Sequence, residues 1–327
     1  MAGTSPAMTP GIQMRFISAA DIRRLLTFPV LVDALEAAHR RPKMEAHDAM
    51  LGDQRELYFV RSAVDAGRFM ASKMITSFPG NIGGDLPAVQ AVVALFDGSN
   101  GKPLAVIDGT ELTYWRTAAD SALGSRLLSR PNVRILVVAG AGEMAKWLVR
   151  AHCAVRPSIE RVLIWNRSAG RAKALVELLR GEGIGAERAS DLDVATREAD
   201  LITTCTRSNM PLVKGANLKP GAHLDLVGGY TPDTREADDE AARRSLVFTD
   251  RRESAFHGVG DILSPIKSGA INEGDVLGDL YDLVPGKVKG RRSASDITFF
   301  KNAGGGHLDL MTAEVIYKRA NSLPASS

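Results

Sequence analysis

One stretch of the chain decides the fold: Arg134-Ile135-Leu136-Val137-Val138-Ala139-Gly140-Ala141-Gly142-Glu143-Met144-Ala145. An apolar run stops at a glycine pair and opens into a helical pattern, which is the order that a dinucleotide-binding turn requires. Gly140 permits the tight turn, Gly142 lets the backbone approach a pyrophosphate, and the small Ala145 lets the helix pack on the strand. The N–H groups that open the helix then face the phosphates, so the stretch predicts a nucleotide site.

The end of the next apolar strand, Val162-Leu163-Ile164-Trp165, indicates which nucleotide binds. An NAD site has Asp or Glu there to hold the ribose 2′-hydroxyl, whereas a 2′-phosphate needs positive charge and hydrogen-bond donors. This chain has Asn166, Arg167 and Ser168, with Arg171 one helical turn further on. Because an arginine fork binds phosphate and a carboxylate repels it, the sequence favours NADP(H) over NAD(H). The alternative is that Arg167 is an ordinary solvated loop residue.

The chain before this stretch has a different character. A helix is expected to begin at Ser18, and residues 30–39 repeat apolar positions at helical spacing. Strands are expected at 57–60, 69–75, 91–96 and 104–107, separated by turn signals and not by helices, which indicates an antiparallel sheet. A long helix then runs from near Thr110 to about Leu128.

From Val133 onward, apolar strands and helices alternate, with strands expected at 135–139, 162–165, 201–205, 224–227 and 246–249. This order is typical of a doubly wound parallel sheet. A last helix, 307–319, is expected to pack back on the first domain. The predicted fold is α/β: a Rossmann domain, 126–304, plus an α+β substrate-binding and dimerisation domain, 1–125 with 305–327.

Composition narrows the functional class. The 327 residues are enough for two domains, and 45% hydrophobic and 24% charged residues are typical of a soluble globular protein. The net charge of +3 comes without a basic block, which argues against a nucleic-acid partner. The two cysteines, Cys153 and Cys205, do not have metal-ligand spacing, and no metal is expected. No segment has the length of a membrane span or the apolar core of a signal peptide, so we expect a cytoplasmic enzyme.

Several motifs together resemble the ornithine cyclodeaminase/μ-crystallin family. They lie in the family's order along nearly the whole chain: Lys73 with Pro79-Gly80-Asn81, Leu112-Thr113-Tyr114-Trp115-Arg116-Thr117-Ala118-Ala119, Gly140-Ala141-Gly142, Val227-Gly228-Gly229, and Ser295-Asp296-Ile297-Thr298 through Gly304. The resemblance implies a first domain that forms a homodimer interface, followed by a Rossmann domain. It also implies action on small α-amino or α-imino acids with a nicotinamide cofactor.

Two cations suit a substrate that carries a carboxylate. Arg116 lies on the helix that leads into the nucleotide domain, so its guanidinium can grip a carboxylate in a cleft between the domains. Lys73 lies in an apolar strand on the face shared with Ala71 and Ile75, where an unpaired ammonium is costly and a functional role is favoured. The resemblance implies that Arg116 binds the carboxylate and that Lys73 contacts the substrate and relays a proton. The alternatives are a surface arginine and a structural lysine.

Two positions depart from the cyclodeaminase pattern. Tyr230 follows Val227-Gly228-Gly229, where cyclodeaminases have an aspartate used in proton transfer and ammonia loss. A tyrosine hydroxyl titrates near pH 10, so it cannot replace that base at neutral pH, although it can donate a hydrogen bond or a proton. The family often has a second carboxylate-binding arginine near Arg41, and here Arg41, Lys43 and Arg61 are all candidates.

In this chain an aromatic residue, Tyr230, and then Thr231-Pro232-Asp233 follow the glycines. In this respect it resembles the branch of the family that contains the NADPH-linked ketimine reductases. The leading hypothesis is reduction of a cyclic imino acid, such as Δ1-pyrroline-2-carboxylate or Δ1-piperideine-2-carboxylate, to the L-amino acid, with Lys73, Arg116 and Tyr230 as catalytic residues. The alternatives are an ornithine cyclodeaminase or L-amino-acid (alanine-type) dehydrogenase, and a non-catalytic, crystallin-like ligand-binding protein. The expected cofactor-binding residues are Gly140, Gly142, Glu143, Met144, Asn166, Arg167, Ser168, Arg171, Thr204, Cys205, Gly228 and Gly304.

Overall fold

The chain forms two compact units. The computed structural model describes residues 14–53, 55–81, 83–229 and 231–322. Unit 1 contains Met1–Leu26, Met44–Thr113 and Asp309–Ser327, and unit 2 contains Thr27–Lys43 and Tyr114–Leu308. Two of these divisions, 113/114 and 308/309, fall inside long helices, α3 (Gly109–Leu128) and α11 (Gly306–Ser322), and the other two fall in loops on either side of the segment 27–43. The domain boundaries expected from sequence, 125/126 and 304/305, lie a short distance from the two divisions inside helices and remain a proposal.

Unit 1 is built on a six-stranded sheet in the order β1-β6-β5-β4-β3-β2. The strands β2 to β6 pair antiparallel as a meander, and β1 adds to β6 in parallel. Their bounds are β1 (Arg15–Ile17), β2 (Glu45–Gly52), β3 (Leu57–Asp65), β4 (Phe69–Ser77), β5 (Val89–Asp97) and β6 (Pro103–Asp108). The expected strands 57–60, 69–75, 91–96 and 104–107 are therefore confirmed, whereas β1 and β2 were not predicted.

Helical segments pack with this sheet in unit 1. Helix α1 (Ala19–Leu25) begins at Ser18, whose side chain and that of Asp21 form a capping box, as expected from sequence. The part of α11 from Asp309 onward lies against β4: Arg68 pairs with Glu314 at 2.7 Å, and the Phe69 and Tyr317 rings are 6.4 Å apart. The final helix therefore contributes to unit 1 from Asp309 onward.

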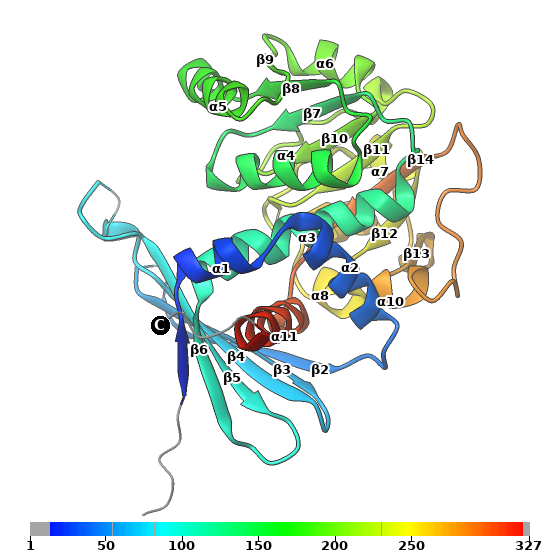
Figure 1. Cartoon of the computed structure of the whole chain (residues 1–327). Helices are drawn as coiled ribbons and strands as arrows, with labels where there is room; N and C mark the ends of the chain where they lie inside the picture. The colour runs from blue at the N-terminus through cyan, green and yellow to red at the C-terminus, as the bar shows by residue number, and fades with distance from the viewer. Residues whose placement is uncertain (1–13, 54, 82, 230, 323–327) are drawn as a thin grey trace, which may run out of the picture. The chain divides into compact units, whose positions relative to one another are not determined.

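Unit 2 is built on an eight-stranded sheet in the order β13-β12-β14-β11-β10-β7-β8-β9, and its strand pairs are parallel (Figure 1). The doubly wound parallel sheet expected from sequence is confirmed. The bounds are β7 (Ile135–Ala139), β8 (Arg161–Trp165), β9 (Ala186–Arg188), β10 (Leu201–Thr204), β11 (His223–Leu226), β12 (Ser245–Thr249), β13 (Val276–Gly278) and β14 (Ile297–Lys301).

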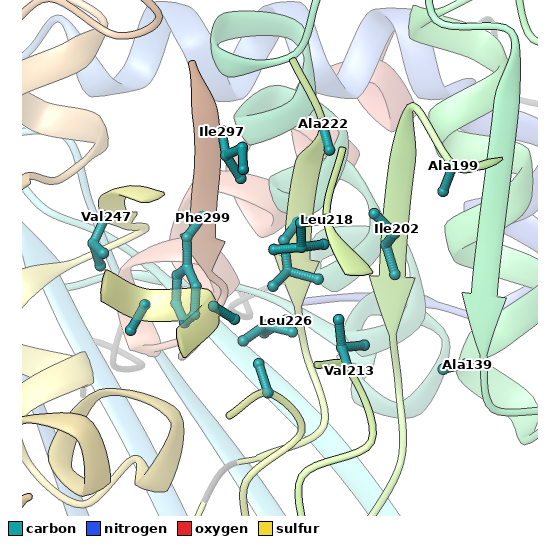
Figure 2. Packing of buried hydrophobic residues seen from close by; sticks show 14 of the residues in the cluster. Ala139, Ala199, Ile202, Val213, Leu218, Ala222, Leu226, Val247, Ile297 and Phe299 are labelled. Carbon is teal, nitrogen blue, oxygen red and sulfur yellow. The ribbon is translucent and has the colours of Figure 1, made fainter. Parts of the chain in front are cut away.

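Alternate side chains of these strands enter separate cores. From β7, Leu136 and Val138 pack with α4 (Glu143–Val155) and α5 (Ala169–Gly181). Val137 and Ala139 belong to the other core, which Figure 2 shows running from Ile202 to Phe299. This core also contains side chains of α6 (Leu192–Glu198), α7 (Asp239–Arg243) and α9 (Gly260–Lys267). Because successive strand residues point to opposite faces, the continuous apolar runs of the sequence reflect a sheet covered on both faces.

The remaining helices of unit 2 are α2 (Phe28–His39), α8 (Arg252–Phe256) and α10 (Leu280–Leu283). Phe28 of α2 lies near Trp147 of α4, with the ring centroids 6.4 Å apart. In the part of the chain that the structure describes, no helix is both long enough and apolar enough to span a bilayer.

Strand β7 has β8 on one side and β10 on the other. The chain first runs outward from β7 through β8 to β9 and then returns to place β10 on the other side of β7. This reversal is the topological switch point, where doubly wound sheets form a crevice at the carboxyl ends of their strands.

Candidate functional site: an arginine-lined cavity at the switch point

A cavity of about 530 Å³ lies at the carboxyl ends of β7, β8 and β10. It is lined by the segments that follow these strands: Gly140, Ala141, Gly142, Trp165, Asn166, Arg167, Arg171, Cys205, Thr206, Arg207, Ser208 and Leu212. The glycine turn and the segment after the second strand, which the sequence analysis singled out, thus lie at one cavity.

The two glycines of the turn have different roles. Gly140 has φ +126°, and a Cβ there would lie 2.8 Å from the Cys205 sulfur, so both conformation and packing require glycine. Gly142 is the N-cap of α4, and a Cβ added to it would meet no atom within 4 Å. Since Gly142 lines the cavity, its missing side chain leaves room for a ligand against the N-terminus of α4, where an anion is favoured. This geometry fits a dinucleotide pyrophosphate.

Three guanidinium groups give the cavity its charge: Arg167, Arg171 and Arg207. Among the described lining residues there is no Asp or Glu. Ser168 is not a lining residue; it is the N-cap of α5, and its Oγ accepts a hydrogen bond from the Arg171 N–H at 3.5 Å. It therefore contributes to the start of the helix that carries Arg171.

Some of the other expected cofactor-binding residues lie away from the described lining. Glu143 and Met144 open α4, and Glu143 pairs with Lys146 at 2.7 Å. The Thr204 hydroxyl and the Gly228 N–H each donate to the buried Glu236 carboxylate at 2.6 Å. The Gly304 N–H donates to Asp250 at 2.6 Å. Their roles in cofactor binding remain proposals.

Cys205 lines the cavity, and burial raises the pKa of its thiol. Its sulfur lies 3.8 Å from the Ala139 carbonyl oxygen. A thiol whose pKa is raised is a poor nucleophile, so a packing role for Cys205 is favoured over a nucleophilic one.

Lys73 is in β4 of unit 1 with only 1% of its side chain exposed. Its ammonium group donates to Asp309 at 2.7 Å and to Thr113 Oγ1 at 3.2 Å, and Asp309 is equally buried. The expected position on the buried face of the strand is confirmed. The carboxylate partner was not predicted, because 236 positions separate it from Lys73.

Arg116 is in the part of α3 that belongs to unit 2 and is 7% exposed, so it is not a surface arginine. Asp120 follows one helical turn later and is fully buried. Burial, and then the charge of Asp250, raise the pKa of the Asp120 carboxyl well above its ordinary value, while Arg116 opposes the shift. A guanidinium in this low-dielectric setting acts strongly on any nearby anion.

The candidates for a second carboxylate-binding cation have the following contacts. Lys43 pairs with Glu253 at 2.7 Å and with Asp279 at 2.8 Å. Arg61 pairs with Asp48 on the neighbouring strand at 3.0 Å, and the Arg41 Nε donates to the Ala38 carbonyl oxygen at 3.4 Å. The choice among the three stays open. Tyr230 lies outside the described residues.

The part of the cavity that follows β10 was not predicted from the sequence; it consists of Thr206, Arg207 and Ser208. A signal was available, because these residues directly follow the expected strand 201–205. The carboxyl ends of parallel strands lie at one edge of the sheet, so a polar segment after that strand should face the same crevice.

The fold and the cavity define this chain as a two-unit α/β protein with a Rossmann-type sheet and a basic cavity at its switch point. It belongs to the ornithine cyclodeaminase/mu-crystallin family, whose model matches residues 16–323.

Relatives of known identity cover nearly the whole chain. A Δ1-pyrroline-2-carboxylate reductase of Paracoccus denitrificans is 41% identical over 302 residues, which span 92% of this chain and 96% of the relative. The structure of the Thermococcus litoralis Δ1-pyrroline-2-carboxylate reductase with NADH and L-proline has TM-score 0.87 at 29% identity, covering 94% of this chain and 98% of the other. An archaeal alanine dehydrogenase dimer with bound NAD has TM-score 0.87 at 28% identity, with coverage of 94% and 96%.

Proposed function

We propose that this protein is a nicotinamide-dependent reductase of small imino acids, that it prefers NADPH, and that it forms an L-amino acid from a cyclic ketimine such as Δ1-pyrroline-2-carboxylate or Δ1-piperideine-2-carboxylate. The substrate class is supported by the 41% identity with the Paracoccus denitrificans reductase over 92% of the chain. The cofactor class is supported by the glycine turn and by relatives that bind NADH or NAD.

The observation that carries the cofactor preference is the charge of the cavity. Arg167 and Arg171 follow β8, the position at which an NAD site has an acid for the ribose 2′-hydroxyl. Three arginines and no described acid line the cavity, which favours a ligand with an additional phosphate.

The chemistry needs a cofactor that supplies hydride and a protein that holds the imine. A bound, reduced nicotinamide supplies a hydride for the imine carbon. For the protein, we propose that Arg116 binds the substrate carboxylate and that Lys73 contacts the substrate and holds a proton, with Tyr230 as a further donor. Positioning of this kind can lower the barrier to hydride transfer by several kcal/mol, and the proposed reaction needs no covalent bond between protein and substrate.

The test is oxidation of NADPH and, in parallel, NADH against a panel of cyclic and linear imino acids. We expect turnover with the cyclic carboxylates and a higher kcat/KM with NADPH. A second arm supplies L-alanine or ornithine with the oxidised cofactors, because the alanine dehydrogenase relative shows that this fold serves amino-acid oxidation. Turnover of ornithine to proline comparable to imine reduction would contradict the proposal, as would turnover confined to L-alanine.

A further inference from the structure

The two glycines Gly228 and Gly229 pack closely against neighbouring groups that leave no room for a side chain. A Cβ on Gly228 would come within 1.9 Å of the Thr206 carbonyl oxygen and 2.6 Å of the Glu236 carboxylate. A Cβ on Gly229 would come within 2.3 Å of the Asp261 carboxylate. Both positions therefore require glycine: the Thr206 backbone and the Glu236 carboxylate lie against Gly228, and the Asp261 carboxylate lies against Gly229.

Glu236 accepts four hydrogen bonds, from the end of β10, from the loop that follows it and from the loop after β11. Thr206 donates to Oε1 through its N–H at 2.6 Å and through its hydroxyl at 2.8 Å. The Thr204 hydroxyl and the Gly228 N–H both donate to Oε2 at 2.6 Å. Glu236 is fully buried, and charge-assisted bonds in such a setting are among the stronger ones in proteins.

A second buried pair holds Glu236 itself in place. Asp261 accepts from the Glu236 N–H at 2.6 Å through one oxygen, and its other oxygen pairs with the Lys301 ammonium at 3.0 Å. Burial, and then the charge of Asp261, raise the pKa of the Glu236 carboxyl, while Lys301 and the hydrogen bonds to the threonines lower it. The carboxyl ends of β10, β11 and β14 are thus joined through side chains.

We infer that Glu236 is a positioning residue for the cofactor cavity: it joins the loop after β10 to the loop after β11 and thereby fixes the wall formed by Thr206, Arg207 and Ser208. The wall continues from the clamped residue, since the Ser208 N–H donates to Thr206 Oγ1 at 3.3 Å. This inference rests on the proposed function in one respect, which is that the cavity takes a nicotinamide dinucleotide. A wall fixed before binding lowers the ordering cost of the ligand complex.

The test compares Glu236→Gln with Asp200→Asn, which changes a second buried carboxylate at the other end of β10. Asp200 accepts the Arg134 and Ile135 N–H groups at 2.8 and 3.1 Å, at the start of β7, and it directly precedes β10. Asp200 is buried and accepts backbone N–H groups, as Glu236 does, but it also pairs with Arg130 at 2.6 Å and with Lys219 at 2.8 Å, and it lies at the opposite end of β10. The Kd for the dinucleotide is measured by protein fluorescence, and stability is measured by thermal unfolding. The rate of amide hydrogen exchange of residues 204–210 is measured without cofactor.

We expect both variants to lower the Tm, but only Glu236→Gln to weaken NADPH binding, by roughly tenfold. The NH2 group of the glutamine cannot accept the hydrogen bonds that a carboxylate oxygen of Glu236 accepts. Exchange at 204–210 should be faster in Glu236→Gln alone. If Glu236→Gln does not fold, Thr204→Val removes a single donor and should raise the Kd by about two- to fivefold.

The outcomes separate this inference from the proposed function. Unchanged Kd and exchange in a folded Glu236→Gln protein, or equal losses in Asp200→Asn, would overturn the positioning role while leaving the proposed function intact. A wild-type protein that binds neither NADPH nor NADH would overturn the proposed function and this inference with it.

Discussion

At the scale of single residues, cofactor choice depends on side chains that differ in charge and in reach. Arg167 follows the last residues of β8, where its guanidinium lines the cavity. A guanidinium forms paired, charge-assisted hydrogen bonds with the 2′-phosphate of NADPH. The uncharged 2′-hydroxyl of NADH interacts with the same guanidinium much more weakly. NADPH and NADH differ only in the 2′-phosphate, so the two cofactors report on this contact separately.

We therefore predict that Arg167→Ala weakens NADPH binding by about 10- to 100-fold, the range for losing a hydrogen bond to a charged group, and leaves NADH nearly unchanged. The measurement is the Kd of each cofactor, with Arg243→Ala on the exposed face of α7 as the control. An equal loss for both cofactors would rule out the 2′-phosphate assignment.

The buried pair of Lys73 and Asp309 allows structural and catalytic roles to be separated. Each side chain is 1% exposed and their charged atoms are 2.7 Å apart. Removing one member leaves the other charge buried, so we predict that Lys73→Met or Asp309→Asn lowers the free energy of unfolding by about 3–5 kcal/mol. The double variant Lys73→Met/Asp309→Leu should recover much of that loss in urea unfolding.

Activity of the double variant decides the role of Lys73. If Lys73 contacts the substrate, the restabilised protein remains inactive toward imino acids although it binds the cofactor normally. Activity restored together with stability would make Lys73 a structural lysine.

At the scale of elements, the sequence predicted the long, strongly patterned segments and missed the short or polar ones. The alternation after Val133 located β7, β8, β10, β11 and β12, because each is a buried apolar run between helices. Strand β2 was missed because it is an edge strand whose side chains are almost all exposed. Strand β14 lies inside the sheet and is buried along its whole length, but it ends in Lys301. A lysine is not expected in a buried strand, and its ion pair with Asp261 was not predicted from the sequence.

The candidate site was predictable to the extent that its residues are local in sequence. The glycine turn and the segment 166–171 are each contiguous, so their pattern reveals them. Asp309 and Glu236 could not be found in this way, because their partners are 236 and up to 32 positions away and no local spacing encodes the contact.

At the end of α2, a buried histidine makes the free energy of unfolding depend on pH. His39 at the end of α2 is buried, its ring centroid is 4.7 Å from that of Tyr281, and its Nδ1 lies 2.7 Å from the Leu35 carbonyl oxygen. Burial lowers the pKa of His39 from 6.5 to about 4, so the folded protein keeps the ring neutral where the unfolded chain protonates it. The contribution is fully present above pH 6.5 and is lost as the pH falls toward 4.

We predict that the free energy of unfolding falls between pH 6.5 and 4 by up to about 3 kcal/mol from this group. His39→Gln should flatten the profile in urea titrations across this range, and His257→Gln, at an exposed position, should not. A wild-type profile that His39→Gln leaves unaltered would show that His39 does not contribute.

At the scale of the whole molecule, the outer face of the six-stranded sheet is apolar and exposed. The strand register places Tyr58 beside Leu51 and Val92 beside Met74 on this face, and Phe16 lies on it at the β1 edge. The exposed fractions of Phe16, Leu51 and Val92 are 70%, 66% and 41%. Monomeric soluble proteins rarely expose contiguous apolar patches of this kind.

We propose that a second copy of the chain covers this face, because that copy would bury these exposed apolar side chains. Sedimentation velocity of the wild type should then give a dimer. Val92→Asp places a charge in the middle of the face and should shift the population toward monomer, since burying an unpaired carboxylate in an apolar interface costs several kcal/mol. Leu178→Asp on α5, where the leucine is 45% exposed, introduces the same charge at similar exposure and should leave the dimer intact. A monomeric wild type, or dimers of equal strength in both variants, would exclude this face as the interface, and the exposed apolar side chains would then need a different partner.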